Sequence, residues 1–66
     1  MKNRLKVLRA EKNMTQEDLA DFVGVSRQTI NAIEKDKFDP SLPTAFKLAK
    51  LFNLSIEEVF HYESEE

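Results

Sequence analysis

Two consecutive helix signals stand in the stretch Thr15-Gln16-Glu17-Asp18-Leu19-Ala20-Asp21-Phe22-Val23-Gly24-Val25-Ser26-Arg27-Gln28-Thr29-Ile30-Asn31-Ala32-Ile33-Glu34. Thr15 and Ser26 each offer a side-chain oxygen to the free amides at the start of a helix. Gly24 is the only glycine of the chain and stands where a left-handed residue ends a helix. The stretch therefore predicts two short helices joined by a tight turn. Their buried faces are marked by Leu19, Ala20 and Val23, and by Ile30 and Ile33.

Three more helices are predicted around this pair. Apolar residues recur at helical spacing before and after it, and Pro43 is tolerated in a first helical turn. Residues 35–40 lack that spacing and end in a proline, so they form a loop. The fold class is therefore all-α, with five helices in one domain over residues 1–66. The three outer helices are residues 3–12, a helix from Ser41 to near Asn53 with Ala45, Phe46, Leu48, Ala49 and Phe52 at helical spacing, and a last one from the capping box Ser55-Ile56-Glu57-Glu58.

Composition excludes several classes of function. With 66 residues, the chain has room for one small domain and not for a separate domain that binds a small molecule. It has no cysteine and one histidine, so we expect neither a metal nor a cofactor. No nucleophile stands in a catalytic arrangement with a base, and we expect no enzyme. No apolar run approaches the length of a membrane span, so we expect a cytoplasmic protein without a membrane partner.

The charge is unevenly distributed along the chain. The formal net charge of −2 taken alone argues against a nucleic-acid partner. However, five of the twelve acids lie in the last ten residues, and residues 1–56 carry ten bases and seven acids, a charge of +3. An acidic C-terminal end thus masks a mildly basic body, and the net charge does not exclude DNA binding.

The two central helices are too short to be stable alone, and such a pair crosses steeply when it packs. This is a helix-turn-helix arrangement, over about residues 15–35, in which the second helix enters the major groove of DNA. The polar side of residues 27–34 carries the chemistry for reading bases, because arginine and glutamine form paired hydrogen bonds with guanine and adenine. The candidate base contacts are Arg27, Gln28, Thr29 and Asn31, with Ala32 able to add an apolar contact.

The sequence resembles a known family. The segments Thr15 to Ala20, Val23 to Ile30 and Ile33-Glu34-Lys35 resemble the Cro/C1-type (XRE) helix-turn-helix of phage and bacterial repressors. Pro40-Ser41-Leu42 and the start of the last helix are typical of its small stand-alone members, similar to cytolysin-operon repressors. The resemblance implies a lambda-repressor-like fold. It also implies a homodimeric transcriptional repressor that reads an inverted repeat in double-stranded DNA.

The resemblance further implies roles for individual residues. Arg27 and Gln28 stand at the positions that read bases in the family. Arg9 and Glu34 stand at the positions of an internal ion pair, and the two chain ends are expected to pair as a short antiparallel ribbon. The expected phosphate contacts are Gln16, Ser26, Lys35 and Lys37.

A dimer interface is expected in residues 51–66. One recognition helix contacts too few base pairs for specificity, so two copies have to be held about 34 Å apart to enter successive major grooves. The C-terminal third carries more apolar side chains than short helices easily hide, and we expect Phe60 as the anchor because large aromatics dominate small interfaces. The candidate interface residues are Leu51, Leu54, Ile56, Val59, Phe60 and Tyr62, and the acidic tail would project away from the phosphates.

Two alternatives stay open at the level of sequence. The first is an antitoxin-type protein whose helix-turn-helix represses its own operon. The second is a helical protein-interaction module that does not bind DNA. A salt titration on duplex DNA separates the second from the others, because a DNA-binding protein displaces counterions from the phosphates it contacts and so loses affinity steeply as the salt concentration rises.

Overall fold

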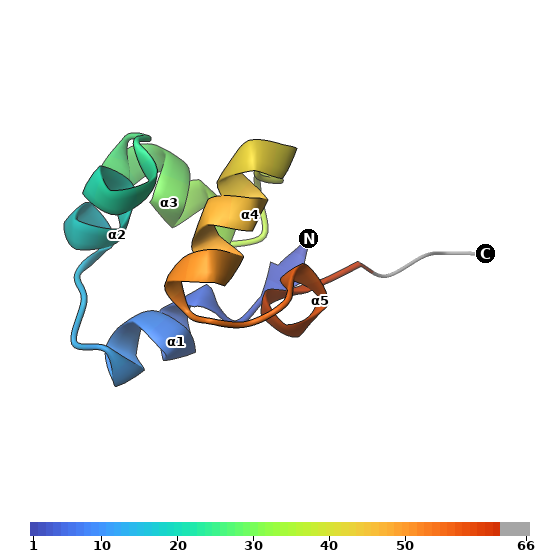
Figure 1. Cartoon of the computed structure of the whole chain (residues 1–66). Coiled ribbons are helices and arrows are strands. Elements are labelled where there is room, and N and C mark those ends of the chain that lie inside the picture. Colours follow the sequence, from blue (N-terminus) through green and yellow to red (C-terminus); the bar gives the residue numbers. More distant parts are fainter. Residues whose placement is uncertain (63–66) are drawn as a thin grey trace.

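The computed structural model describes residues 1–62 and contains five helices and a two-stranded ribbon in that range (Figure 1). The five expected helices are therefore confirmed, and none of them is long and apolar enough to cross a membrane. Glu63, Glu65 and Glu66 of the acidic tail lie outside the described residues. The elements in order are β1 (Lys2–Asn3), α1 (Leu5–Glu11), α2 (Gln16–Val23), α3 (Arg27–Glu34), α4 (Leu42–Leu51), α5 (Ile56–Val59) and β2 (Phe60–His61).

The helices surround one apolar core. In Figure 1, α2 and α3 lie together at one end, α5 lies beside the N-terminal strand at the other, and α4 runs between them. Leu48 in the middle of α4 has no exposed surface, and every helix contributes at least one buried side chain. This shared core holds helices that would be too short to persist alone. The core consists of Leu5, Leu8, Leu19, Ala20, Val23, Ile30, Ile33, Ala45, Leu48, Ala49, Phe52, Val59 and Phe60.

Side-chain caps set the helix boundaries of α2 and α3 as the sequence predicts. The Thr15 hydroxyl accepts a hydrogen bond from the Asp18 amide at 3.0 Å, and the Asp18 carboxylate accepts one from the Thr15 amide at 3.0 Å. The Ser26 hydroxyl accepts from the Thr29 amide at 3.1 Å. Gly24 ends α2 with a φ of 81°, a left-handed conformation that costs glycine little. The turn between the two helices is therefore fixed locally.

The first helix begins at Leu5 and not at residue 3. Lys2 and Asn3 form β1, which pairs antiparallel with β2 in the register Lys2 with His61 and Asn3 with Phe60. The Asn3 side-chain oxygen accepts a hydrogen bond from the Leu5 amide at 3.1 Å and so replaces a partner that the helix start lacks. The expected ribbon is thus confirmed, and it shortens the helix that the periodicity predicts.

The capping box at the start of α5 is also present. The Ser55 amide donates to the Glu58 carboxylate at 2.8 Å, and the Ser55 hydroxyl accepts from the Glu58 amide at 3.2 Å. Hydrogen bonds to the charged carboxylate favour ionisation, so they hold the pKa of Glu58 below its ordinary value. The charged form of Glu58 therefore stabilises the folded chain.

We expect Glu58→Gln to lower the melting temperature at neutral pH and to have no effect in acid. A carboxyl with a lowered pKa in the folded state stabilises the fold above its unfolded pKa of about 4.3, and that contribution disappears as the pH falls through the folded pKa. Thermal melts of the wild type and of Glu58→Gln, from about pH 7 down to about pH 3, measure this difference in melting temperature. Glu57→Gln is the control, since it removes the charge of a neighbouring residue that takes no part in the capping box. A melting difference that stays constant with pH contradicts this account.

Candidate nucleic-acid interface

The third helix has one buried and one exposed face. Ile30 and Ile33 are buried against the core, with exposed fractions of 0% and 1%. Arg27 and Gln28 are exposed in the first turn of the helix, and Ala32 is half-buried further along. α2 packs against α3 and fixes the direction of α3, whereas the side chains of Arg27 and Gln28 are exposed. Arg27 and Gln28 thus leave a guanidinium and a carboxamide accessible at the start of α3.

The other two candidate base contacts differ from this pair. Thr29 is half-buried, and its hydroxyl lies 2.9 Å from the Ser26 hydroxyl within the helix cap. It also lines a hollow together with Phe38 and Pro40 of the following loop. The structure therefore brings Thr29 to the loop side of α3 and does not group it with Arg27 and Gln28.

Asn31 is also half-buried, and it contacts α2. Its side-chain oxygen accepts a hydrogen bond from Gln16 Nε2 at 3.2 Å. The same Gln16 nitrogen donates to Glu34 Oε1 at 3.1 Å. The side-chain amide of Gln16, expected on a phosphate, is thus engaged with α3 within the molecule. Sequence reasoning missed this link because the residues are fifteen and eighteen positions apart.

The expected ion pair between Arg9 and Glu34 is present. Arg9 Nε donates to Glu34 Oε2 at 2.8 Å, and Arg9 Nη2 donates to Glu34 Oε1 at 3.2 Å. The third nitrogen, Nη1, donates to the Met14 carbonyl at 3.0 Å. The Glu34 side chain is only 5% exposed and that of Arg9 is 17% exposed. The hydrogen bond to the carboxylate raises the pKa of Arg9, against the opposing effect of burial, so the guanidinium stays charged.

The loop after α3 carries the two expected lysine contacts. Lys35 and Lys37 are both exposed, so their ammonium groups are accessible from outside. Asn3 Nδ2 donates to the Ile33 carbonyl at 2.8 Å and approaches Asp36 Oδ1 at 3.3 Å, which ties this loop to β1. Asp36 has a φ of 61°, in the left-handed region that an aspartate tolerates. Sequence reasoning missed the role of Asn3 because the contact spans thirty residues.

The apolar surface at the C-terminal end differs from the expected one. Val59 and Phe60 have exposed fractions of 0% and 4%, because both pack in the core. This burial corrects the expectation that they reach across an interface with Phe60 as anchor. Tyr62 is 80% exposed, whereas Leu51, Leu54 and Ile56 are half-buried.

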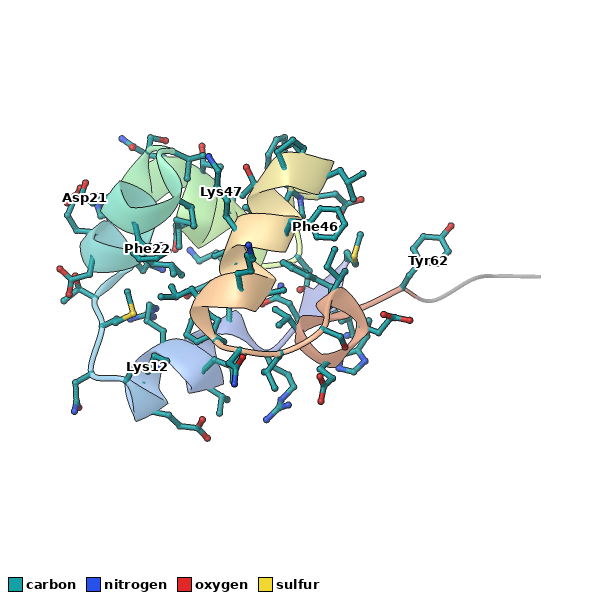
Figure 2. The ribbon with its side chains drawn as sticks, viewed as in Figure 1. Lys12, Asp21, Phe22, Phe46, Lys47 and Tyr62 are labelled. Atoms are coloured by element: carbon teal, nitrogen blue, oxygen red, sulfur yellow. The ribbon has the colours of Figure 1, made fainter. Side chains whose placement is uncertain are left out.

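Two residues of α4 extend this apolar surface. Phe46 is 55% and Leu42 is 65% exposed, although helical spacing had placed Phe46 with the core residues. Ile56 lines one hollow with Phe46 and Leu54 and a second with Leu42. Figure 2 shows Phe46 projecting from α4 on the side of Tyr62, away from Phe22 on α2. We call Leu42, Phe46, Ile56 and Tyr62 the apolar face.

Comparisons with known proteins agree with this architecture. The family model described as Helix-turn-helix matches residues 5–59. The chain is 64% identical over 66 residues, the full length of both proteins, to an uncharacterized HTH-type transcriptional regulator of Methanocaldococcus jannaschii.

Two solved structures share the fold. The restriction-modification controller protein C.AhdI of Aeromonas hydrophila is 33% identical, with a TM-score of 0.76 and 86% of each chain covered. SinR of Bacillus subtilis, in a crystal structure with DNA, is 27% identical, with a TM-score of 0.72 over 82% of this chain and 87% of that one. With its capped helix pair and five-helix lambda-repressor-like fold, the chain belongs to the Cro/C1-type helix-turn-helix family of DNA-binding transcriptional regulators.

Proposed function

We propose that the protein is a homodimeric repressor that reads an inverted repeat by inserting α3 into the major groove of DNA. The observation that carries this proposal is the exposed first turn of α3, with Arg27 and Gln28 free on a helix whose opposite face is fixed. The N-terminal residues of a recognition helix are those that reach the base edges in this geometry. Bidentate contacts from Arg27 to guanine and from Gln28 to adenine then provide sequence preference.

The exposed lysines supply affinity without sequence preference. Lys35 and Lys37 follow α3 directly, in a loop that runs along the sugar-phosphate backbone when α3 lies in the groove. Ser26, exposed at the cap of α3, is the third phosphate contact. The side-chain amide of Gln16 is engaged with α3, so Gln16 reaches a phosphate only through its backbone amide.

The apolar face is the proposed dimer surface. Its residues Phe46 and Tyr62 lie on the far side of α4 from α2 (Figure 2), so a partner bound to them leaves α2 accessible. Lys50 and Glu57 line the same hollow as Phe46, which gives a two-fold partner opposite charges to pair with. Half-buried Leu51 and Leu54 support this surface.

Repression follows when the dimer occupies a DNA site that overlaps a promoter. A dimer on two successive major grooves covers one side of the duplex over more than one helical turn, and polymerase cannot use a promoter that overlaps it. This mode of action needs no further chemistry than DNA binding itself. It applies equally to an antitoxin-type protein that represses its own operon.

We expect Gln28→Ala and Lys37→Ala to weaken DNA binding in different ways. Gln28→Ala should remove roughly 1–3 kcal/mol at one base position and relax the preference there. Lys37→Ala should weaken all sequences about equally and reduce the slope of log affinity against log salt by about one. Binding of both variants to a randomised duplex pool, read by sequencing, separates the effects. If Gln28→Ala left the base preference unchanged, α3 would not be the element that reads sequence.

A further inference from the structure

The hydrogen bonds between α1, α2 and α3 form a chain that ends at the groove-facing side of α3. Arg9 is paired with the carboxylate of Glu34, and one oxygen of that carboxylate, Oε1, also faces the Gln16 side chain at 3.1 Å. A carboxylate can only accept hydrogen bonds, so the Gln16 atom that faces it has to be the amide nitrogen. The ion pair thus dictates which way round the Gln16 amide lies.

The same logic passes on to Asn31. Gln16 Nε2 has two hydrogens and no lone pair to offer, and its second hydrogen points to Asn31. The Asn31 atom that faces it therefore has to be the side-chain oxygen, at 3.2 Å. The Asn31 amide nitrogen is left pointing outward. It has no hydrogen-bond partner among residues 1–62, and it is not among the buried polar atoms, so solvent or a ligand can reach it.

We propose that Gln16 is a positioning residue that fixes Asn31 as a pure hydrogen-bond donor and so makes Asn31 select guanine over adenine. An unconstrained asparagine recognises adenine by donating to N7 and accepting from N6. Here the accepting oxygen is turned toward α2, so adenine loses one of its two bonds. Guanine presents two acceptors, N7 and O6, to an outward amide nitrogen. This inference rests on the proposed function, because it assumes that α3 lies in the major groove.

The test measures base preference at the position that Asn31 contacts, by sequencing duplexes bound from a randomised pool. Asn31→Ala identifies the position by the preference that it removes, and the wild type should favour guanine over adenine there. Gln16→Met keeps the length of the side chain and removes its amide, so the Asn31 amide can rotate. We expect the adenine-to-guanine ratio at this position to rise about tenfold in Gln16→Met, the scale of one bidentate contact.

Two comparisons make the result specific. Glu17→Met changes the neighbouring exposed residue of α2 and should leave the ratio unaltered, and the preference at the position read by Gln28 should be the same in all proteins. That second preference reports on the proposed function independently. The inference is overturned if Gln16→Met weakens all sequences equally, which would mark a phosphate contact. An effect of Glu17→Met as large as that of Gln16→Met, or no position sensitive to Asn31→Ala, overturns it as well.

Discussion

Glu34→Ala should lower the free energy of unfolding by about 3 kcal/mol, the lower end of the range for breaking a buried ion pair. The loss arises because the charged guanidinium of Arg9, 17% exposed, keeps its burial and loses its counter-charge. Gln16 loses an acceptor at the same time. For a domain of this size the change corresponds to roughly 12–24 °C in melting temperature. Folded proteins have a free energy of unfolding of about 5–15 kcal/mol, so this change would remove a large part of the stability of a small domain.

Thermal and urea melts of three variants test this expectation. Arg9→Ala should be at least as damaging as Glu34→Ala, because it leaves a carboxylate that is only 5% exposed without its partner. Glu11→Ala, an exposed acid on α1, is the matched control and should change the free energy by about 0.5 kcal/mol or less. If Arg9→Ala and Glu34→Ala both melted with the wild type, the ion pair would not hold α1 to α3.

The second large effect is expected for Phe46→Glu on operator binding. A glutamate on the apolar face leaves a buried charge in any dimer formed there, whereas the free monomer tolerates it because Phe46 is 55% exposed. Dissociation separates the two recognition helices, and the advantage of joined half-sites, about 10²–10⁴ in affinity, is lost. We therefore expect the variant to fold, to sediment as a monomer at micromolar concentration, and to bind its operator at least about 100-fold more weakly.

Phe22→Glu is the control for this experiment. Phe22 is the same residue type with a similar exposed fraction of 60%, and it lies on α2 away from the apolar face (Figure 2). It should leave the sedimentation of the protein unchanged. A wild type that sediments as a strict monomer, together with operator binding that Phe46→Glu leaves intact, would contradict the proposed dimer.

Local chemistry made most of the fold predictable. Thr15, Ser26 and Ser55 each cap a helix through an amide three residues ahead, and Gly24 ends one through its own backbone. These interactions lie within one turn of the chain, so residue type and spacing are enough to identify them. The start of the first helix was misplaced because Asn3 is held by Phe60 on a distant strand, which no local pattern reveals.

The candidate site was only partly predictable for the same reason. The family resemblance indicated the Arg9–Glu34 pair, and the polar side of α3 follows from the positions of Ile30 and Ile33. The bond between Gln16 and Asn31 depends on how two helices cross, which periodicity does not specify.

Burial at the C-terminal end was the least predictable feature of the surface. Phe46 and Phe60 are both aromatic residues in apolar surroundings, and only the packing of α4 and the ribbon decides that the first is exposed and the second buried.

The most direct test is to let the wild-type protein select from a pool of random duplex DNA and to sequence what it retains. The account predicts one enriched inverted repeat, with half-site centres separated by about 10 base pairs, the distance between successive major grooves on one side of the duplex. Retention should fall steeply as salt rises, because contacted phosphates release counterions. A pool that stays random after repeated selection at low salt, or an enriched sequence without two-fold symmetry, would contradict a homodimer that reads DNA through α3.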